Sequence, residues 1–141
     1  MPITPTEKIW FNGELIPWDD AKIHILTHTL HYGMGVFEGI RAYETDDGPA
    51  VFRLTDHMRR MDQSARILMM PLPYSVDEMV QAVKDTVRST GLPSCYVRPI
   101  AYYGYGEMGL NTLPCSVDVA VACWPWGAYL GDDSLTNGVR M

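Results

Sequence analysis

Short apolar segments separated by polar turn residues make up the first part of this chain, a pattern that predicts β-strands. Residues 9–11 and 14–16 flank Asn12-Gly13. This pair adopts positive φ at low energetic cost, as both central positions of a type I′ turn require. We therefore predict a hairpin over residues 9–16.

Further turn residues divide the next segment into short elements. Residues 22–25 alternate between polar and apolar like a short strand, and Thr27 is a candidate cap for a helical turn that runs through His31. The segments 35–44 and 50–54 flank residues 45–49 (TDDGP), whose composition is typical of a tight connection between antiparallel strands. A second hairpin is predicted there.

Two later segments carry apolar residues at helical spacing. The first runs from Thr55, a candidate N-cap, to Leu68, and Arg59, Arg60 and Arg66 project away from its apolar stripe. The second begins with a capping box formed by Ser75 and Glu78 and ends at Gly91. The apolar stripes are Met58, Met61, Ala65 and Leu68 in the first helix, and Val76, Met79, Val80, Val83 and Val87 in the second.

Two segments rich in β-branched and aromatic residues, 94–103 and 116–124, predict longer strands. Pro99 lies inside the first, and because proline cannot donate a backbone hydrogen bond, we expect an edge strand or a bulge there. Both strands fit a sheet that the two helices cover. The predicted fold class is α+β, an antiparallel-rich sheet with two main helices packed on one side.

Composition and charge exclude several classes of function. The chain has 141 residues, 47% of them hydrophobic, which is typical of one compact domain. Its formal net charge of −6 disfavours binding to nucleic acid or to an anionic membrane surface. The first residues do not form an export signal, and the longest apolar run, 119–130, is broken by Pro125 and Gly127. Neither export nor a membrane span is expected.

Cysteine and histidine spacing argues against a metal site. The three cysteines form an odd set without a CxxC pair, which disfavours a disulfide framework and a zinc site and favours a reducing cytoplasm. His24, His28 and His31 would line one face of a continuous helix, a spacing that can bind zinc. The strand-like alternation around His24 breaks this geometry, so we interpret these residues as hydrogen-bonded packing histidines.

One strand face combines an arginine with a glycine, which is unusual for a core. In a strand that starts at Val36, the side chains that share this face are Phe37, Gly39 and Arg41. A glycine inside a strand marks either the close approach of a ligand or another backbone, or a bulge beside a solvated arginine. The pattern alone leaves both interpretations open.

Two other arginines allow a similar choice. Alternation places Tyr96 and Arg98 on a common face, where they either hold a carboxylate between them or form a surface arginine that lies over a tyrosine. On the predicted helix over residues 55–68, Arg60 is either a phosphate ligand or part of a solvated face.

Longer strings of residues resemble one family. Residues 28–41, HTLHYGMGVFEGIR, closely resemble the HxLHYGxxVFEGIR signature of branched-chain amino-acid aminotransferases, pyridoxal-phosphate enzymes of fold type IV. Further segments match in the same order, at residues 9–14, 51–60 with 64–65, 96–99 and 124–131. The resemblance spans nearly all of this sequence but only the N-terminal part of the family's length. It implies the small domain of a fold type IV enzyme.

The resemblance implies roles for the matching residues. Arg60 would bind the phosphate of pyridoxal 5′-phosphate. Arg98 would receive the distal carboxylate of glutamate, Tyr96 would help to hold the α-carboxylate, and Arg41 would brace the tyrosines. The pocket for an aliphatic side chain would be lined by Phe37, Gly39, Tyr96 and Tyr129. One site would then accept amino acid and 2-oxo acid substrates with either apolar or charged side chains.

The resemblance also implies a homodimer. In this family, the residue that matches Tyr32 and a loop that matches Met108-Gly109-Leu110 reach into the pocket of the neighbouring subunit. Tyr32, Met108 and Leu110 are therefore expected to complete the substrate site of a second copy.

One essential residue has no counterpart here. Transamination requires a lysine that forms a Schiff base with pyridoxal phosphate. The chain contains only Lys8, Lys22 and Lys84, and none lies in a segment that matches the catalytic lysine of the family. We expect residues 1–126 to form the small N-terminal domain, 127–136 an interdomain loop and 137–141 the start of a second domain. We also expect this chain alone to be inactive.

Three hypotheses follow for function. The leading one is part of a branched-chain aminotransferase, which transfers the amino group between leucine, isoleucine or valine and 2-oxoglutarate. D-amino-acid aminotransferase and aminodeoxychorismate lyase share the fold and are alternatives, although residues 32–41 and 96–99 argue against both. The third is a noncatalytic binding or assembly module, which the missing lysine favours and the retained Arg60, Tyr96 and Arg98 do not.

Overall fold

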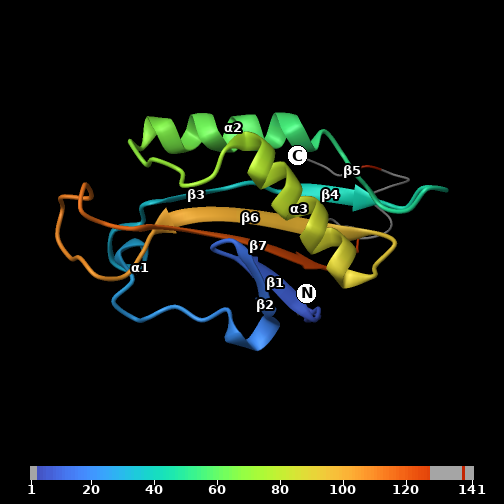
Figure 1. Cartoon of the computed structure of the whole chain (residues 1–141), viewed down its shortest axis with the longest axis horizontal. Helices are drawn as coiled ribbons and strands as arrows, with labels where there is room; N and C mark the ends of the chain where they lie inside the picture. The colour runs from blue at the N-terminus through green and yellow to red at the C-terminus, as the bar shows by residue number, and fades with distance from the viewer. Residues whose placement is uncertain (1–2, 128–137, 139–141) are drawn as a thin grey trace.

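The computed structural model of the chain describes residues 3–127 and Gly138. In this part of the chain the strands form one antiparallel sheet in the order β2-β1-β7-β6-β4-β5, and β3 pairs with β6 beyond the end of β4 (Figure 1). The strands are β1 (Lys8–Phe11), β2 (Glu14–Pro17), β3 (Gly35–Phe37), β4 (Ile40–Tyr43), β5 (Ala50–Val51), β6 (Cys95–Tyr103) and β7 (Val117–Trp124). The helices are the 3-10 helix η1 (Trp18–Asp20), α1 (His28–Tyr32), α2 (Leu54–Ile67) and α3 (Val76–Thr90). The predicted α+β class is confirmed.

The first hairpin is formed as predicted. Phe11 lies opposite Glu14, and the turn residues Asn12 and Gly13 have φ of 46° and 103°. The predicted strand over residues 22–25 is wrong. This segment pairs with no strand of the described structure, and the backbone N–H of Leu26 donates instead to the ring Nδ1 of His24 at 3.1 Å. A local turn there replaces the ladder hydrogen bonds that a strand needs.

The strand predicted over residues 35–44 is divided into β3 and β4. Both pair with β6 in one continuous register, with Phe37 opposite Ile100 and Ile40 opposite Val97. Between them, the N–H of Glu38 donates to the carbonyl of Pro99 at 3.0 Å, but Pro99 has no N–H to return the second bond of the pair. The predicted second hairpin is confirmed for β4 and β5.

Pro99 does not mark an edge or a bulge, so that prediction is wrong. Strand β6 lies in the interior of the sheet, and its register with β7 is unbroken from Tyr96 to Tyr103. The sheet tolerates proline there because one ladder bond is lost to the β3–β4 side, where the partner strand is interrupted.

The helices begin and end close to their predicted bounds. Helix α3 has the predicted capping box, in which the N–H of Glu78 donates to Ser75 Oγ and the N–H of Ser75 donates to the Glu78 carboxylate, and it ends at Gly91 with φ of 63°. Helix α2 begins at Leu54, after Arg53 with φ of 49°, so Thr55 is not its cap. Helix α1 follows Thr27 as predicted, but the side chain of Thr27 makes no capping hydrogen bond.

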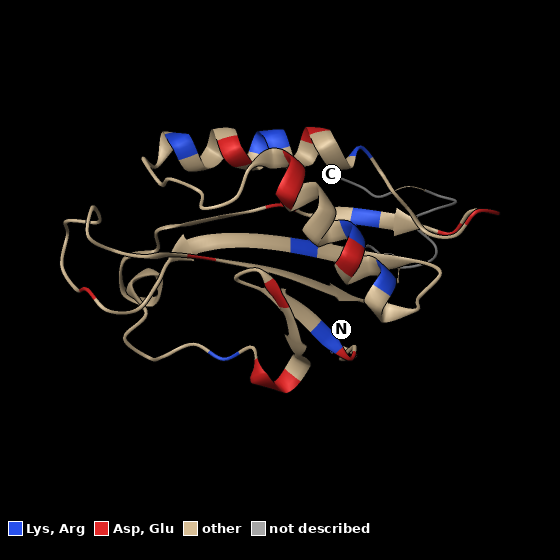
Figure 2. Cartoon of the chain, in the orientation of Figure 1, with Lys and Arg blue, Asp and Glu red and all other residues tan. Residues whose placement is uncertain are grey.

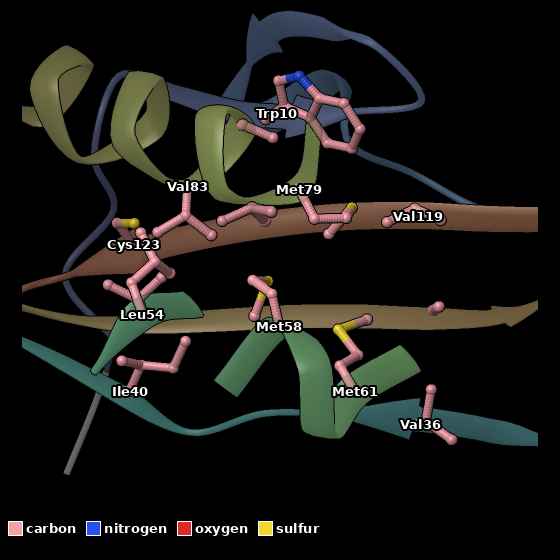
Figure 3. Packing of buried hydrophobic residues seen from close by; sticks show 14 of the residues in the cluster. Trp10, Val36, Ile40, Leu54, Met58, Met61, Met79, Val83, Val119 and Cys123 are labelled. Carbon is pink, nitrogen blue, oxygen red and sulfur yellow. The ribbon is translucent and has the colours of Figure 1, made fainter. Parts of the chain in front are cut away.

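Helices α2 and α3 pack their apolar stripes on one face of the sheet (Figure 1). Figure 3 shows Met58, Met61 and Val83 pointing from the helices toward β6 and β7, and all three are at most 1% exposed. Burial of such a stripe stabilises each helix by several kcal/mol, about 1.5–3 for each large side chain. Charged residues of both signs are interspersed along the helices (Figure 2).

Candidate functional site

The strand face that carries the predicted pocket residues points away from the helices. Glu38, Ile40 and Ala42 are buried at 4%, 1% and 1% exposure, whereas Phe37 is 60% exposed. Gly39 and Arg41 alternate with the buried residues, so they lie with Phe37 on the open face. The prediction that Phe37, Gly39 and Arg41 share one face is confirmed.

A hollow of about 440 Å³ lies on this open face. Arg41 on β4 is directly opposite Tyr96 on β6, and Arg98 is two residues further along β6. The residues that line the hollow are Gly39, Arg41, Tyr96, Arg98 and Trp126. The sheet register therefore brings together four of the residues predicted to bind substrate.

Arg98 and Tyr96 form the polar centre of this hollow. Arg98 NH2 donates to the Tyr96 hydroxyl at 2.7 Å, and the guanidinium carbon lies 4.5 Å from the centroid of the Phe37 ring. Arg98 Nε is buried and has no hydrogen-bond partner in the described structure. A guanidinium that lies beside a phenol hydroxyl and an apolar ring is suited to receiving a carboxylate.

Gly39 provides the space that the Tyr96 hydroxyl occupies. A Cβ at residue 39 would stand 2.5 Å from Tyr96 Oη, well inside van der Waals contact. Because β3 and β4 share one register with β6, no bulge accompanies this glycine. Neither interpretation left open by the pattern describes what the structure shows: the group that approaches Gly39 is the phenol of Tyr96, which is a side chain and not a ligand or another backbone.

Arg41 connects the hollow to the segment that follows β7. Its NH2 donates to the carbonyl of Trp126 at 2.9 Å, and its NH1 donates to the carbonyl of Gly127 at 3.4 Å. The Trp126 ring packs edge-on against Tyr96, with centroids 4.4 Å apart. Sequence reasoning did not select Trp126, although it lies inside the matched string 124–131. Tyr129 and most of the predicted interdomain loop, residues 128–136, lie outside the described residues.

Arg60 lies on α2 and is held by Glu38. Arg60 Nε donates to Glu38 Oε1 at 2.7 Å and Arg60 NH2 donates to Oε2 at 2.5 Å, while His57 Nδ1 lies 2.8 Å from Oε2. Burial raises the pKa of Glu38, but the hydrogen bonds and charges of Arg60 and His57 outweigh burial and lower it. The same carboxylate raises the pKa of Arg60. The sequence signal for this cluster was Glu38, a charged residue on the strand face whose other residues, Ile40 and Ala42, belong to the core.

Arg60 and the hollow lie on opposite faces of the sheet. Glu38 points to the helix side and binds Arg60, whereas the next residue, Gly39, faces the hollow. The structure therefore does not bring Arg60 into the hollow of Arg98, and it places the two sites on either side of the Glu38-Gly39 junction. In the described residues β3 pairs with β6 alone, so this junction is at a sheet edge.

Tyr32, Met108 and Leu110 are not close to the hollow. Tyr32 and Leu110 line a separate hollow of about 510 Å³ together with His28 and Met69. Their exposures are 39% for Tyr32, 48% for Met108 and 88% for Leu110. His28 Nε2 lies 2.8 Å from the carbonyl of Gly109, which connects α1 to the loop between β6 and β7. These residues form a second, largely apolar surface at the other end of β6.

No group of three or more histidine, cysteine or acidic residues could hold a metal ion within the described part of the chain. The three cysteines are free thiols, and a hydrogen bond with Cys95 together with burial raises the pKa of Cys123. Of the helices that the structure describes, none has the length and apolar character that crossing a membrane requires.

Comparison with known proteins identifies relatives for this arrangement. The family described as amino-transferase class IV matches residues 35–140. A branched-chain-amino-acid aminotransferase of Pseudomonas aeruginosa is 50% identical over 133 residues, which are 94% of this chain and 43% of that protein. The chain thus spans less than half the length of the relatives it matches.

Solved structures agree with the sequence comparison. The crystal structure of the branched-chain amino acid aminotransferase of Escherichia coli superposes with a TM-score of 0.91 and 47% identity, over 95% of this chain and 44% of that one. A structure of the T.th. branched-chain amino acid aminotransferase in complex with N-(5′-phosphopyridoxyl)-L-glutamate matches with a TM-score of 0.84 and 49% identity, over 88% of this chain and 42% of that one.

Proposed function

The chain belongs to the class IV aminotransferases, and from this we propose that it supplies the substrate-recognition face and the phosphate-binding arginine of a branched-chain aminotransferase. The parent reaction is amino transfer between leucine, isoleucine or valine and 2-oxoglutarate. The observation that carries the proposal is the Arg98–Tyr96 pair beside the exposed ring of Phe37.

This arrangement suits a site that must accept two kinds of side chain. An apolar leucine-type side chain packs against the Phe37 ring, and the absence of a side chain at Gly39 lets the Tyr96 hydroxyl lie close to the strand. The distal carboxylate of glutamate or 2-oxoglutarate reaches the guanidinium of Arg98 beside the Tyr96 hydroxyl. Arg41 holds the Trp126 segment as one wall. The T.th. relative, whose bound group carries a glutamate, supports this assignment.

The residues present fit the phosphate end of pyridoxal phosphate. Arg60 is 64% exposed at its side chain and uses one edge of its guanidinium on Glu38, which leaves the NH1 side for an anion. When bound, this cofactor supplies the electron sink that amino transfer requires. None of Lys8, Lys22 and Lys84 lines the hollow at Gly39, and all three are exposed. We propose that the cofactor-holding lysine comes from residues outside these 141, and that this chain alone does not transaminate.

Tyr32 and the loop around Leu110 fit a role toward a second copy of the chain. They lie away from the hollow of their own chain and present exposed apolar side chains, which a homodimer would bury. The three free thiols are compatible with the reducing cytoplasm.

The test is a substitution that separates the two substrate classes. In the protein produced from its complete coding sequence, Arg98→Gln should raise the KM for 2-oxoglutarate about tenfold or more while leaving that for the branched 2-oxo acid nearly unchanged, since one charged hydrogen-bond donor is lost. Arg88→Gln, an exposed arginine on α3, is the matched control. Equal effects on both substrates would contradict the assignment of Arg98.

The alternative is a noncatalytic module. It is favoured by the position of the three lysines away from the hollow. A protein from the complete coding sequence that binds neither pyridoxal phosphate nor 2-oxoglutarate would support it. Activity assays with D-amino acids and with aminodeoxychorismate test the two other enzymes of this fold, D-amino-acid aminotransferase and aminodeoxychorismate lyase.

A further inference from the structure

We propose that Glu38 is a positioning residue for Arg60, which it holds by one edge so that the opposite edge faces the phosphate of the cofactor. This inference rests on the proposed function, in which Arg60 binds that phosphate. It concerns a residue on the core side of the sheet that touches neither substrate nor cofactor.

The hydrogen bonds define which edge of Arg60 is occupied. Nε donates to Oε1 at 2.7 Å and NH2 donates to Oε2 at 2.5 Å, a two-point contact that fixes the plane of the guanidinium. A guanidinium has five N–H groups, and since Arg60 NH2 also lies 3.4 Å from His57 Nδ1, the NH1 pair is the part turned away from Glu38. The Arg60 side chain is 64% exposed, so an anion in solvent can approach it.

Glu38 itself is fixed on several sides. Its side chain is 4% exposed, and its backbone N–H donates to the carbonyl of Pro99 within the sheet. His57, one turn before Arg60 on α2, lies 2.8 Å from Oε2 and completes a cluster that ties α2 to the strand. An arginine is otherwise a long, flexible side chain. A rigid carboxylate against its guanidinium therefore reduces the conformational freedom that the side chain would lose on binding phosphate.

Two effects of Glu38 on phosphate binding have opposite signs. Its negative charge offsets part of the positive charge of Arg60 and would weaken anion binding, whereas its two-point contact orients Arg60 and would strengthen it. Because Arg60 is exposed, the charge effect is screened by water and salt. We expect orientation to dominate.

The experiment compares pyridoxal phosphate with pyridoxal, which lacks the phosphate, in the protein produced from its complete coding sequence. The ratio of their dissociation constants, measured by equilibrium titration of the protein fluorescence, reports phosphate recognition independently of turnover. Arg60→Ala should abolish the preference for the phosphorylated form. Glu38→Gln and Glu38→Asp should each reduce it about tenfold, the scale on which orienting partners of a ligand-binding side chain act.

The two variants at residue 38 separate orientation from charge. Glu38→Asp keeps the charge but is one methylene shorter and cannot make both contacts, whereas Glu38→Gln keeps the length and removes the charge. In the Arg60→Ala background neither should have a further effect. Glu44→Gln, an exposed carboxylate just after β4, is the matched control. An increased preference in Glu38→Gln, or an unchanged one in Glu38→Asp, would overturn the positioning role.

If the variants at residue 38 fail to fold, Arg60→Lys decides the question. Lysine keeps the positive charge but has no planar fork for Glu38 to hold, so the phosphate preference should fall as it does in Arg60→Ala. A lysine variant with wild-type preference would show that orientation is not needed. The proposed role of Arg60 in phosphate binding, and not the role of Glu38, would be contradicted by either of two results. One is a wild-type protein without preference for pyridoxal phosphate over pyridoxal, and the other is an Arg60→Ala variant that keeps this preference.

Discussion

The hydroxyl of Tyr96 occupies the space where a side chain at residue 39 would begin. A Cβ built on Gly39 would lie 2.5 Å from Tyr96 Oη but 3.4 Å from Cζ, so only the hydroxyl overlaps it. Gly39 does not have a positive φ. The site therefore needs glycine at this position because it has no side chain. The backbone conformation of Gly39 is one that other residues can adopt.

Substitution Gly39→Ala should move the Tyr96 ring without unfolding the protein. The displaced hydroxyl would lose the hydrogen bond from Arg98 NH2, and the ring would shift against Trp126. We expect 2-oxoglutarate to bind about tenfold more weakly, the effect of one lost hydrogen bond to a charged group, and stability to fall by less than about 1 kcal/mol. Isothermal titration calorimetry measures the first effect, urea titration measures the second, and tryptophan emission reports the movement of the ring.

The double variant Gly39→Ala with Tyr96→Phe is the control for this overlap. Without the hydroxyl, the nearest ring atom would be at ordinary contact distance, so the ring should return to its place beside Trp124 and Trp126. Its tryptophan emission should then match that of Tyr96→Phe alone. Emission that matches Gly39→Ala instead would show that the alanine disturbs the backbone.

His28 should control the loop between β6 and β7. Its side chain is 1% exposed, its ring Nε2 lies 2.8 Å from the carbonyl of Gly109, and its backbone N–H donates to the carbonyl of Gly104 at 2.9 Å. His28→Ala removes the side-chain contact and leaves a cavity under Tyr32, a loss of about 2 kcal/mol or more. Hydrogen exchange of the amides at residues 108–110 should become faster, while α3 should change less.

His31→Ala is the matched control on the same short helix. Its ring contacts the carbonyl of Ile25 at 2.9 Å, outside the loop. We expect faster exchange near residue 25 and no change at residues 108–110. If both variants increase exchange at residues 108–110 equally, the order of the loop depends on the stability of α1 as a whole. His28 would then have no specific role in the loop.

Local signals in the sequence predicted most of the fold because each element is encoded over a few residues. The Asn12-Gly13 turn, the Ser75–Glu78 capping box and the alternation around Ile40 required no knowledge of the neighbouring strands. The predictions that failed concerned features that depend on contacts between distant segments. The effect of Pro99 depends on which strand lies opposite, and the exposed segment 22–25 has no partner strand in the described structure, which its own alternation could not reveal.

The candidate site shows the same limit. Alternation placed Gly39 and Arg41 on one face and Tyr96 with Arg98 on another, but only the register of β4 with β6 showed that these faces are the same surface. The contacts of Glu38 with Arg60 and His57 join the junction of β3 and β4 to a helix about 20 residues later, beyond the reach of a periodicity argument. Glu38 among core residues was the one visible hint of them.

The capping box should contribute measurably to stability. Ser75→Ala removes the acceptor for the N–H of Glu78 and the hydroxyl that donates to the Glu78 carboxylate at 2.7 Å. We expect the free energy of unfolding to fall by about 1 kcal/mol in urea titrations. Ser64→Ala, inside α2 and without a capping role, should be neutral or slightly stabilising because alanine has the higher helix propensity. Equal losses in both variants would argue against the cap.

The Glu38 cluster should make stability depend on pH in one direction. The pKa of Glu38 is lowered in the folded chain from its ordinary value of 4.5, because the hydrogen bonds and charges of Arg60 and His57 outweigh burial. A lowered carboxyl pKa stabilises the folded state above pH 4.5, and this contribution is lost as the pH falls below that value toward the folded pKa. Glu38→Gln should therefore be less stable than wild type by about 1–2 kcal/mol near pH 7.

The same comparison at low pH tests the mechanism. Once Glu38 is protonated in both the folded and the unfolded chain, it resembles glutamine, so the difference in unfolding free energy between wild type and Glu38→Gln should shrink as the pH falls below 4.5. Glu44→Gln, which removes an exposed carboxylate without a salt bridge in the described structure, should change stability by less than about 0.5 kcal/mol at either pH. A difference for Glu38→Gln that persists unchanged at low pH would mean that packing, and not the ion pair with Arg60, sets the contribution of this residue.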